Sequence, residues 1–310
     1  MRSLPRFFAL FLALCLLSAL VCSCADMPEP ADAEKTALRE ALNAARPETP
    51  AAGSPSLDVI VIDVGQGDSI LLISPEGKTM LVDAGPPGAF DRIRETLDAH
   101  HVDSLDVVVA THPHEDHIGS MADVLNAYPV GTFVTIPPTR EIRANAVDAV
   151  LSENCCAVVY AEGGTTLPWA ESCTVTVLNP VPGYAAEPED LNDRSVVLHV
   201  RYGDTAILLT GDAEELAEKR MLDTFPRSML RADVLKLGHH GSSSSTGFSF
   251  FLAVDPDFAV ASCGAGNDYG HPHKDTLSLL YDTHTAFYST DTDGTVTFRL
   301  DGKTVSVDPS

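Results

Sequence analysis

The residues best suited to chemistry in this chain are four potential metal ligands packed into one short stretch. His112, His114, Asp116 and His117 follow directly after the apolar run of residues 107–110. Imidazole nitrogens and carboxylate oxygens are common ligands of zinc, manganese and iron, and a catalytic ion also needs an open position for water. At the end of a strand, the first two histidines can face one ion, while the acid and the last histidine face a second. The stretch therefore predicts half of a two-metal site.

The remaining ligands are expected at the ends of two later strands. The predicted strand at residues 205–210 leads to Asp212, a carboxylate able to bridge two ions, and the strand at residues 233–237 leads to the pair His239-His240. Taken alone, Asp212 is equally compatible with a cap at the start of a helix over residues 213–222. Beside two histidine-rich strand ends, the ligand interpretation is favoured.

Seven short motifs occur in order along the chain. They are residues 62–69 (IDVGQGDS), 81–85 (LVDAG), 112–119 (HPHEDHIG), 192–195 (NDRS), 209–212 (LTGD), 237–242 (LGHHGS) and 269–273 (YGHPH). In this order they resemble the metallo-β-lactamase-type domain at the C-terminus of ComEC DNA-uptake proteins, and the similarity runs from Leu57 to about the end of the chain. Nothing in the chain resembles the ComEC membrane channel, so we expect the hydrolase module to stand alone.

The resemblance implies an α/β (α+β) fold, the metallo-β-lactamase αββα four-layer sandwich, with all ligand loops on one edge. It also implies a metal-dependent hydrolase related to DNA uptake and competence. Hydrolysis of β-lactams is not expected, because the similarity is to the ComEC branch and not to the antibiotic-resistance enzymes.

The ligand set follows from these motifs. We predict His112 and His114 for a first ion, and Asp212 between the two ions. The second ion is assigned to Asp116, His117 and His239. Asp116 is also a candidate for orienting or deprotonating the attacking water. Only one histidine of the pair His239-His240 is expected to reach a metal. We assign His239, which is nearer the strand end, and leave His240 for contact with substrate.

Asn192 lies where many related enzymes place another histidine of the first ion. An amide oxygen is a poorer zinc ligand than imidazole, so this ion is expected to be weakly held, replaced by manganese, or coordinated through water. ComEC-type sequences share the asparagine, so it does not argue against the family. The predicted cofactors are two divalent ions, zinc first and manganese as the alternative.

Three further positions have two interpretations each. Asp83 resembles the family's aspartate that hydrogen-bonds the histidine loop, or it is a turn residue before Gly85. The glycine-flanked loop of residues 63–68 could line the cleft or simply close a tight hairpin. His271 is a candidate phosphate contact or general acid, or it belongs to a surface loop stiffened by Pro272.

The predicted reaction is hydrolysis of a phosphodiester, in DNA or in a smaller phosphoester. A divalent ion can lower the pKa of bound water from ~15.7 towards ~7, and a pair of ions stabilises both the attacking and the leaving oxygen. The alternative is a non-catalytic surface lipoprotein that binds DNA or an envelope partner. Binding alone does not require six metal-binding side chains, so the enzyme is favoured.

The charge of the chain bears on the substrate. Asp and Glu number 44 against 20 Lys and Arg, for a formal net charge of −24. Proteins that hold long nucleic acids usually carry a basic stripe, because neutralised phosphates supply much of the affinity. No such stripe is visible, although Arg194, Lys236 and Lys274 lie beside the motifs and could bind one phosphate. Extensive DNA binding by this chain alone is therefore disfavoured.

The N-terminus has the pattern of an export signal. Arg2 and Arg6 precede the apolar run of residues 7–21, and Val21-Cys22-Ser23-Cys24 resembles a bacterial lipobox. We expect Cys24 to be lipidated, which would anchor the protein to the extracytoplasmic face of the cell membrane. An ordinary cleaved signal peptide and an uncleaved anchor helix are the alternatives.

Three segments are therefore expected: a lipoprotein signal peptide at residues 1–23, a lipidated cysteine and Ala/Pro-rich tether at 24–56, and the hydrolase domain at 57–310. A short helix could form at residues 31–46 within the tether. Of the cysteines, a disulfide between Cys156 and Cys173 is compatible with export, but burial as apolar side chains is favoured.

The hydrolase domain is expected to alternate strands with helices, and its first three strands should pair antiparallel. Expected strands are residues 57–63, 69–74, 79–83, 105–110, 132–136, 157–160, 173–178, 195–202, 205–210, 233–237, 258–262 and 295–300. Expected helices are residues 89–101, 118–128 and 140–153, with two more near Ala213 and Thr276.

Overall fold

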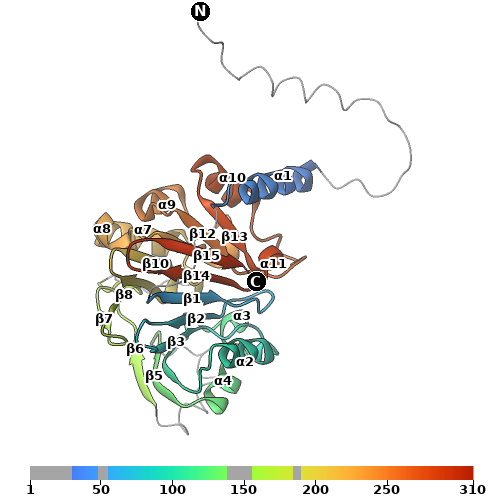
Figure 1. Ribbon diagram of the computed structural model, residues 1–310. Coiled ribbons are helices and arrows are strands. Elements are labelled where there is room, and N and C mark those ends of the chain that lie inside the picture. The colour runs from blue at the N-terminus through green and yellow to red at the C-terminus, as the bar shows by residue number, and fades with distance from the viewer. Residues whose placement is uncertain (1–29, 48–54, 138–155, 184–189, 310) are drawn as a thin grey trace, which may run out of the picture.

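Two β-sheets pack face to face in the computed structural model, which describes residues 30–47, 55–137, 156–183 and 190–309 (Figure 1). Within these residues the first sheet has eight strands in the order β15-β14-β1-β2-β3-β4-β5-β6, and the second has seven in the order β13-β12-β11-β10-β9-β8-β7. The first sheet comprises β1 (Leu57–Val61), β2 (Ile70–Ile73), β3 (Thr79–Val82), β4 (Leu105–Val109), β5 (Val130–Thr135), β6 (Ala157–Tyr160), β14 (Val296–Leu300) and β15 (Val305–Pro309). The second comprises β7 (Thr166–Leu167), β8 (Cys173–Asn179), β9 (Val197–Tyr202), β10 (Thr205–Leu209), β11 (Val234–Lys236), β12 (Phe258–Ala261) and β13 (Ala286–Ser289).

Helices cover the outer face of each sheet. The first sheet carries α2 (Phe90–Ala99), α3 (Glu115–Ile118) and α4 (Met121–Ala127), and the other helices are α1 (Pro30–Ala44), α7 (Glu215–Thr224), α8 (Arg227–Leu230), α9 (Phe248–Val254), α10 (Lys274–Asp282) and α11 (Thr290–Asp293). The predicted αββα sandwich is confirmed.

The strands are apolar on both faces because each sheet is covered on both sides. In β1, Val59 and Val61 belong to the core between the two sheets, whereas Ile60 packs in the layer beneath α2 and α4. A third apolar layer lies between the second sheet and its helices and includes Met221 of α7 and Leu277 of α10. This packing on both faces holds the two sheets in place and therefore also positions the loops at the ends of their strands.

Strand direction brings the ligand loops to one edge. The strands β1, β2 and β3 pair antiparallel, as the sequence predicted, and β3, β4 and β5 then pair parallel. In the second sheet β10, β11 and β12 are also parallel. Because parallel strands end at the same edge of a sheet, the segments that follow β10 and β11 lie side by side. The contact of His117 with Asp212 places the segment after β4 next to them.

Some predicted elements differ from those observed. The helix expected at 118–128 is divided between α3 and α4, because the backbone leaves helical geometry at Ser120, where φ is −102° and ψ is 9°. Elements of two to seven residues are too short for a periodic pattern, and β7, α8, α9, β13, α11 and β15 were not predicted. The helix predicted at 140–153 lies outside the described residues.

The helix expected within the tether forms as α1 and packs on the domain beside α10 and β13 (Figure 1). Its Leu42 is buried, and Arg39 pairs with Asp291 at 2.9 Å. Beyond the helix end, Arg46 pairs with Asp293 at 2.6 Å. Part of the segment predicted as a tether is therefore docked onto the hydrolase domain.

The remaining N-terminal predictions concern residues that the structure does not describe. The signal peptide and Cys24 lie outside the described residues. Within the part that is described, no helix combines the length and apolar character needed to cross a membrane. Cys173 and Cys263 are buried thiols, as predicted.

Candidate metal centre

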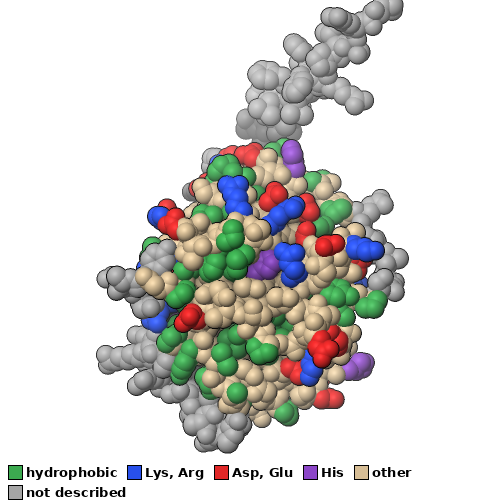
Figure 2. Space-filling model, turned by 90° about the vertical axis from the view of Figure 1, so that its left-hand side faces the viewer, with side chains coloured by type: hydrophobic (Ala, Val, Ile, Leu, Met, Phe, Trp, Pro, Cys, Tyr) green, Lys and Arg blue, Asp and Glu red, His purple; other side chains and the backbone are tan. Residues whose placement is uncertain are grey.

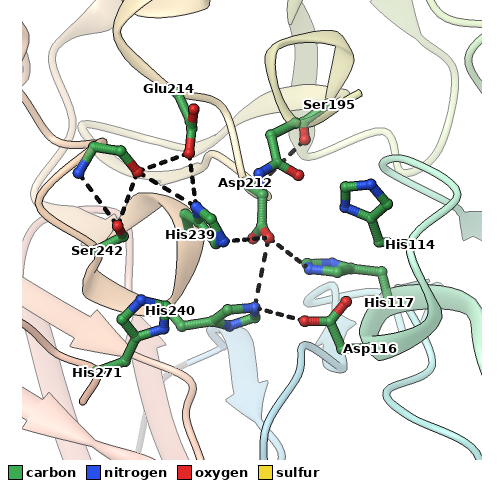
Figure 3. A network of polar contacts seen from close by, with 12 residues as sticks. His114, Asp116, His117, Ser195, Asp212, Glu214, His239, His240, Ser242 and His271 are labelled. Carbon is green, nitrogen blue, oxygen red and sulfur yellow. Dashed lines mark hydrogen bonds and ion pairs between the residues drawn. The ribbon is translucent and has the colours of Figure 1, made fainter. Parts of the chain in front are cut away.

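Four imidazole rings converge on one oxygen of Asp212, which follows β10. Figure 3 shows three of them, those of His117, His239 and His240. Measured to Asp212 Oδ2, the Nε2 atom of His117 lies at 3.1 Å and that of His240 at 3.5 Å. The Nε2 atoms of His239 and His112 lie at 3.8 and 3.9 Å. Asp212 is almost completely buried, so an ionised carboxylate here requires several positive or polar neighbours.

Asp212 does not cap a helix. The helix α7 begins at Glu215, and it is the carboxylate of Asp193 that accepts hydrogen bonds at its start, from the backbone N–H groups of Glu214 and Ala217 at 3.1 and 2.9 Å. Asp212 is left to face the histidines. The geometry therefore agrees with the ligand interpretation.

His239 and His240 lie in different environments, although they are adjacent in sequence. His240 is buried, and its Nε2 lies 3.2 Å from Asp116 Oδ2. The side chain of His239 is 27% exposed, and its Nδ1 contacts Glu214 Oε1 at 2.8 Å. The sequence favoured His239 as the ligand of this pair. In the structure the nitrogen of His240 is nearer to Asp212 and also reaches Asp116, so the geometry favours His240.

An unusual turn points both rings into the centre. His239 and His240 have φ values of 46° and 57°, in the left-handed region that β-carbon atoms disfavour. The following Gly241 has φ of 87°, and a β-carbon on it would lie 2.5 Å from Pro272. Such a strained turn is retained only where the surrounding packing holds it.

Carboxylates support the two most buried histidines from behind. His117 Nδ1 contacts Asp83 Oδ2 at 2.7 Å, and Asp83 also accepts hydrogen bonds from the backbone and hydroxyl of Thr111. His240 Nδ1 donates to the carbonyl of Ser262 at 2.8 Å and lies 3.3 Å from Asp68 Oδ1. A carboxylate or carbonyl on one ring nitrogen leaves the other available for a metal. Asp83 thus has the orienting position predicted for it.

Asp68 belongs to the glycine-flanked loop that the sequence analysis placed as a possible cleft lining, but it was not predicted among the ligands. With His117, Asp212 and His240 it forms a buried group whose candidate ligand atoms all lie within 4.8 Å of one another. Its Oδ2 pairs with Lys236 Nζ at 2.8 Å, and both side chains are buried. The available signal was Gly67, where a β-carbon would lie 2.2 Å from the Asp116 carbonyl oxygen, so that only glycine allows this loop to approach the histidine loop.

His112 and His114 form a second group with weaker support. The Nε2 of His112 lies 3.0 Å from the Nδ1 of His114, and the other ring nitrogen of His112 faces the hydroxyls of Thr111 and Ser195 at 3.1 and 3.3 Å. Asn192 is buried on η2 (Asn192–Arg194), and its Oδ1 has no hydrogen-bond partner among the residues that the structure describes. Hydroxyls orient an imidazole less strongly than a carboxylate does.

Opposite charges at short range set the protonation of the centre. Burial disfavours protonation of His240, but Asp212 and the hydrogen bond to Asp116 raise its pKa to about 9. Burial disfavours ionisation of Asp116, but His240 and His117 lower the pKa of this carboxyl to about 2. Despite burial, His117 and His240 likewise hold the pKa of Asp212 well below its ordinary value. These carboxylates are charged at neutral pH and need cations beside them.

His271 belongs to the centre and not to an exposed loop. His271 is 5% exposed. The centroid of its ring lies 5.4 Å from that of His239 and 6.0 Å from that of His240. Gln66 of the glycine-flanked loop approaches its Nδ1 at 3.5 Å. Burial, together with the nearby His240, lowers the pKa of His271 to about 3, so its neutral form prevails at neutral pH.

The donor set fits a divalent metal. Within the described part of the chain, Asp212 Oδ1 and Asn192 Oδ1 are buried without a hydrogen-bond partner, which is costly unless a cation or water satisfies them. Imidazole and carboxylate ligands with carboxylates behind the histidines are typical of catalytic metal sites. The buried cluster is thus a candidate centre for divalent metal.

Known proteins show the same domain. A family model described as the metallo-beta-lactamase superfamily matches residues 62–153. ComE operon protein 3 of Bacillus subtilis (strain 168) is 32% identical over 273 residues, covering 81% of this chain and 34% of that protein. Competence protein ComA of Neisseria gonorrhoeae is 30% identical over 243 residues, covering 78% of this chain and 32% of that protein. This chain spans about a third of the length of these relatives.

A solved structure agrees with this at the level of the fold. A CmlA beta-hydroxylase variant superimposes with a TM-score of 0.52 at 16% identity, covering 80% of this chain and 55% of that chain. The two relatives and the family match identify the chain as a ComEC-like protein of the metallo-β-lactamase superfamily, and the two-sheet sandwich and this likeness agree with that fold.

Proposed function

We propose that this protein is a metal-dependent hydrolase that cleaves phosphodiester bonds. The observation that carries the proposal is the convergence of four imidazole Nε2 atoms on a single buried oxygen of Asp212. A solely structural aspartate would be satisfied by one or two hydrogen bonds. The same convergence weighs against a non-catalytic binding lipoprotein, which has no need of it.

The residues divide into two groups for two divalent ions, zinc or manganese. Asp116, His117 and His240 would hold one ion, with Asp212 shared. His112 and His114 would hold the other, with the Asn192 amide oxygen beside it or separated from it by a water. When bound, the ions would lower the pKa of a water and offset the negative charge of a phosphate.

The protein's own side chains would position the substrate. His239 lies at the exposed rim of the centre, where the Glu214 carboxylate fixes its ring through Nδ1 and leaves Nε2 facing inward (Figure 3). His271 lies beside it and offers a neutral imidazole. His271 can donate a hydrogen bond to a phosphate oxygen from Nε2, and the protonated form of His239 can do the same. Such contacts orient the phosphorus for in-line attack.

The acidic character of the chain favours a short substrate. On the face shown in Figure 2, Lys and Arg side chains are interspersed with acidic and apolar ones and form no continuous stripe. The relatives are named for competence, which supports a nucleic acid or a piece of one. A nucleotide-sized phosphodiester satisfies both observations, and long duplex DNA satisfies only the second.

The test is a comparison of metal content and activity. The purified protein is loaded with zinc or manganese and assayed on bis-p-nitrophenyl phosphate, single-stranded DNA and duplex DNA. We expect bound metal, hydrolysis of the small diester, and loss of both in His240→Ala but not in His284→Ala. Absence of metal and of activity on all three substrates would refute the enzyme.

We also propose that the chain is an exported lipoprotein. Its support is the basic, apolar and Ser23-Cys24 pattern of the N-terminus. Processing in a bacterial host should be blocked by globomycin and by Cys24→Ala. Unchanged processing in both cases would contradict lipidation.

A further inference from the structure

A separate pocket of about 400 Å³ lies beside the metal centre. It is bounded by α7, by the serine-rich turn that follows His240, and by the start of α9. Its volume is in the range of pockets that bind small organic molecules. No ligand assigned above enters it, so it requires its own explanation.

One turn forms a wall of both the pocket and the centre. Ser244, which lines the pocket, donates a hydrogen bond to Glu214 Oε1 at 2.7 Å, and the same oxygen contacts His239 Nδ1. In Figure 3, Glu214 and Ser242 lie on the side of His239 that faces away from His117. A group in the pocket would thus be next to a phosphate held at His239.

The pocket combines an aromatic face with apolar walls. Phe248 is 62% exposed at the start of α9, although a side chain of this size is usually covered. Leu222 is half-buried and Phe250 is buried in the same wall. The backbone turn that leads to Phe248 is held in place because Glu218 accepts hydrogen bonds from the backbone N–H groups of Thr246 and Gly247.

The polar groups of the pocket exclude a phosphate and suit an uncharged group. Glu215 and Glu218 are acidic, and the cation Lys219 is engaged by Asp223 at 2.6 Å. Ser243 and Ser249 of the same wall are exposed. A ligand that stacked on the aromatic ring and hydrogen-bonded to these serines would use both features of the wall.

We infer that this pocket binds the nucleobase of a nucleotide substrate whose phosphodiester lies at the metal centre. The inference rests on the proposed phosphodiesterase function and specifies its substrate class. A nucleobase is flat, uncharged and edged with hydrogen-bonding groups, which matches an exposed phenylalanine in a serine-lined wall. An acyl chain would offer these serines no hydrogen bond.

Two substrates with the same leaving group test the pocket. Thymidine 5′-(p-nitrophenyl phosphate) and methyl p-nitrophenyl phosphate both release p-nitrophenolate and differ only in the nucleoside. We expect the wild type to have the higher kcat/KM on the nucleoside ester. Phe248→Ala should lower this value about tenfold, the scale of one stacked base, and leave the methyl ester unchanged. Phe248→Trp should retain the preference.

Leu252→Ala is the matched control, because Leu252 is exposed on the same helix but does not line the pocket. If Phe248→Ala changed the hydrolysis of both esters equally, or of neither, the proposed nucleobase binding would be refuted, whereas the proposed hydrolase function would stand. If neither ester is hydrolysed, the proposed function is wrong. Calorimetric titration with thymidine then tests separately whether the pocket binds a nucleoside. Binding that is lost in Phe248→Ala supports it, and absence of binding to the wild type refutes it.

Discussion

The two groups of candidate ligands differ in how firmly the protein holds them. In the group of Asp116, His117 and His240, the histidines are fixed by buried carboxylates and a carbonyl. In the group of His112 and His114, the rings contact each other and two hydroxyls. Carboxylate support orients an imidazole and strengthens its donor nitrogen. We expect the carboxylate-supported group to bind its ion before the hydroxyl-supported group does.

The difference has its origin in the fold. Asp83 and Asp68 flank β3 and β2 of the first sheet, so the strands that build the core also carry the supporting carboxylates. Asn192 and Ser195 come from the short η2 turn and its end, outside any sheet. Rigid elements position ligands more accurately than loops do.

The largest effect is expected for Asp212, because both groups depend on it. Asp212→Ala should lower kcat/KM on bis-p-nitrophenyl phosphate by roughly 10²–10³-fold, the scale of removing one preorganised electrostatic contact. Metal bound per chain should fall for both ions. Asp204→Ala, an exposed turn position, is the control. A variant at position 212 that kept both ions would show that the two groups do not share this carboxylate.

The next effect separates the two groups directly. Asp83→Asn keeps the size of the side chain but removes the charge behind His117, and we expect metal affinity to fall roughly 10–100-fold. Ser195→Ala removes a hydroxyl behind His112 and should lower metal affinity by a smaller factor than Asp83→Asn does. The measurement is competition with a colorimetric chelator for each variant. If Ser195→Ala weakened binding more than Asp83→Asn, the ranking of the two groups would be reversed.

A chelator should remove the two ions in sequence from the wild type. The ion at His112 and His114 should leave first, because Asn192 offers it an amide in place of an imidazole. Asn192→His should bring the two removal steps together by raising the affinity of the weaker ion about tenfold. Metal content by mass spectrometry during chelator titration records both steps. Simultaneous loss from the wild type would mean that the ions bind as one unit.

The sequence predicted the sandwich and the ligand loops well, because both depend on local signals. A strand that is buried on both faces is a continuous run of apolar residues in the sequence. Histidines that follow such a run are therefore expected at an edge of the sheet. The choice between His239 and His240 could not be made this way. It depends on two consecutive left-handed residues, which reverse the side chains relative to an ordinary strand end. Asp68 was predicted only as part of a loop that could line the cleft, and not as a member of the ligand cluster, because its partners His240 and Lys236 are distant in sequence.

The smallest effect on metal binding is expected from a change at Glu218, a buried carboxyl outside the metal centre. Asp116 is kept ionised by histidines, whereas burial, with Asp193 and Glu215 nearby, raises the pKa of Glu218 to about 7. The folded protein therefore retains a proton that the unfolded chain releases between about pH 4.5 and 7, and stability should fall by roughly 3 kcal/mol across this window and not beyond it. Glu218→Gln cannot ionise and should remove this slope without changing metal content. The test is urea unfolding of both proteins at pH 5 and at pH 8. If the difference in unfolding free energy between the two proteins were the same at both pH values, Glu218 would already be ionised at pH 5 in the folded protein.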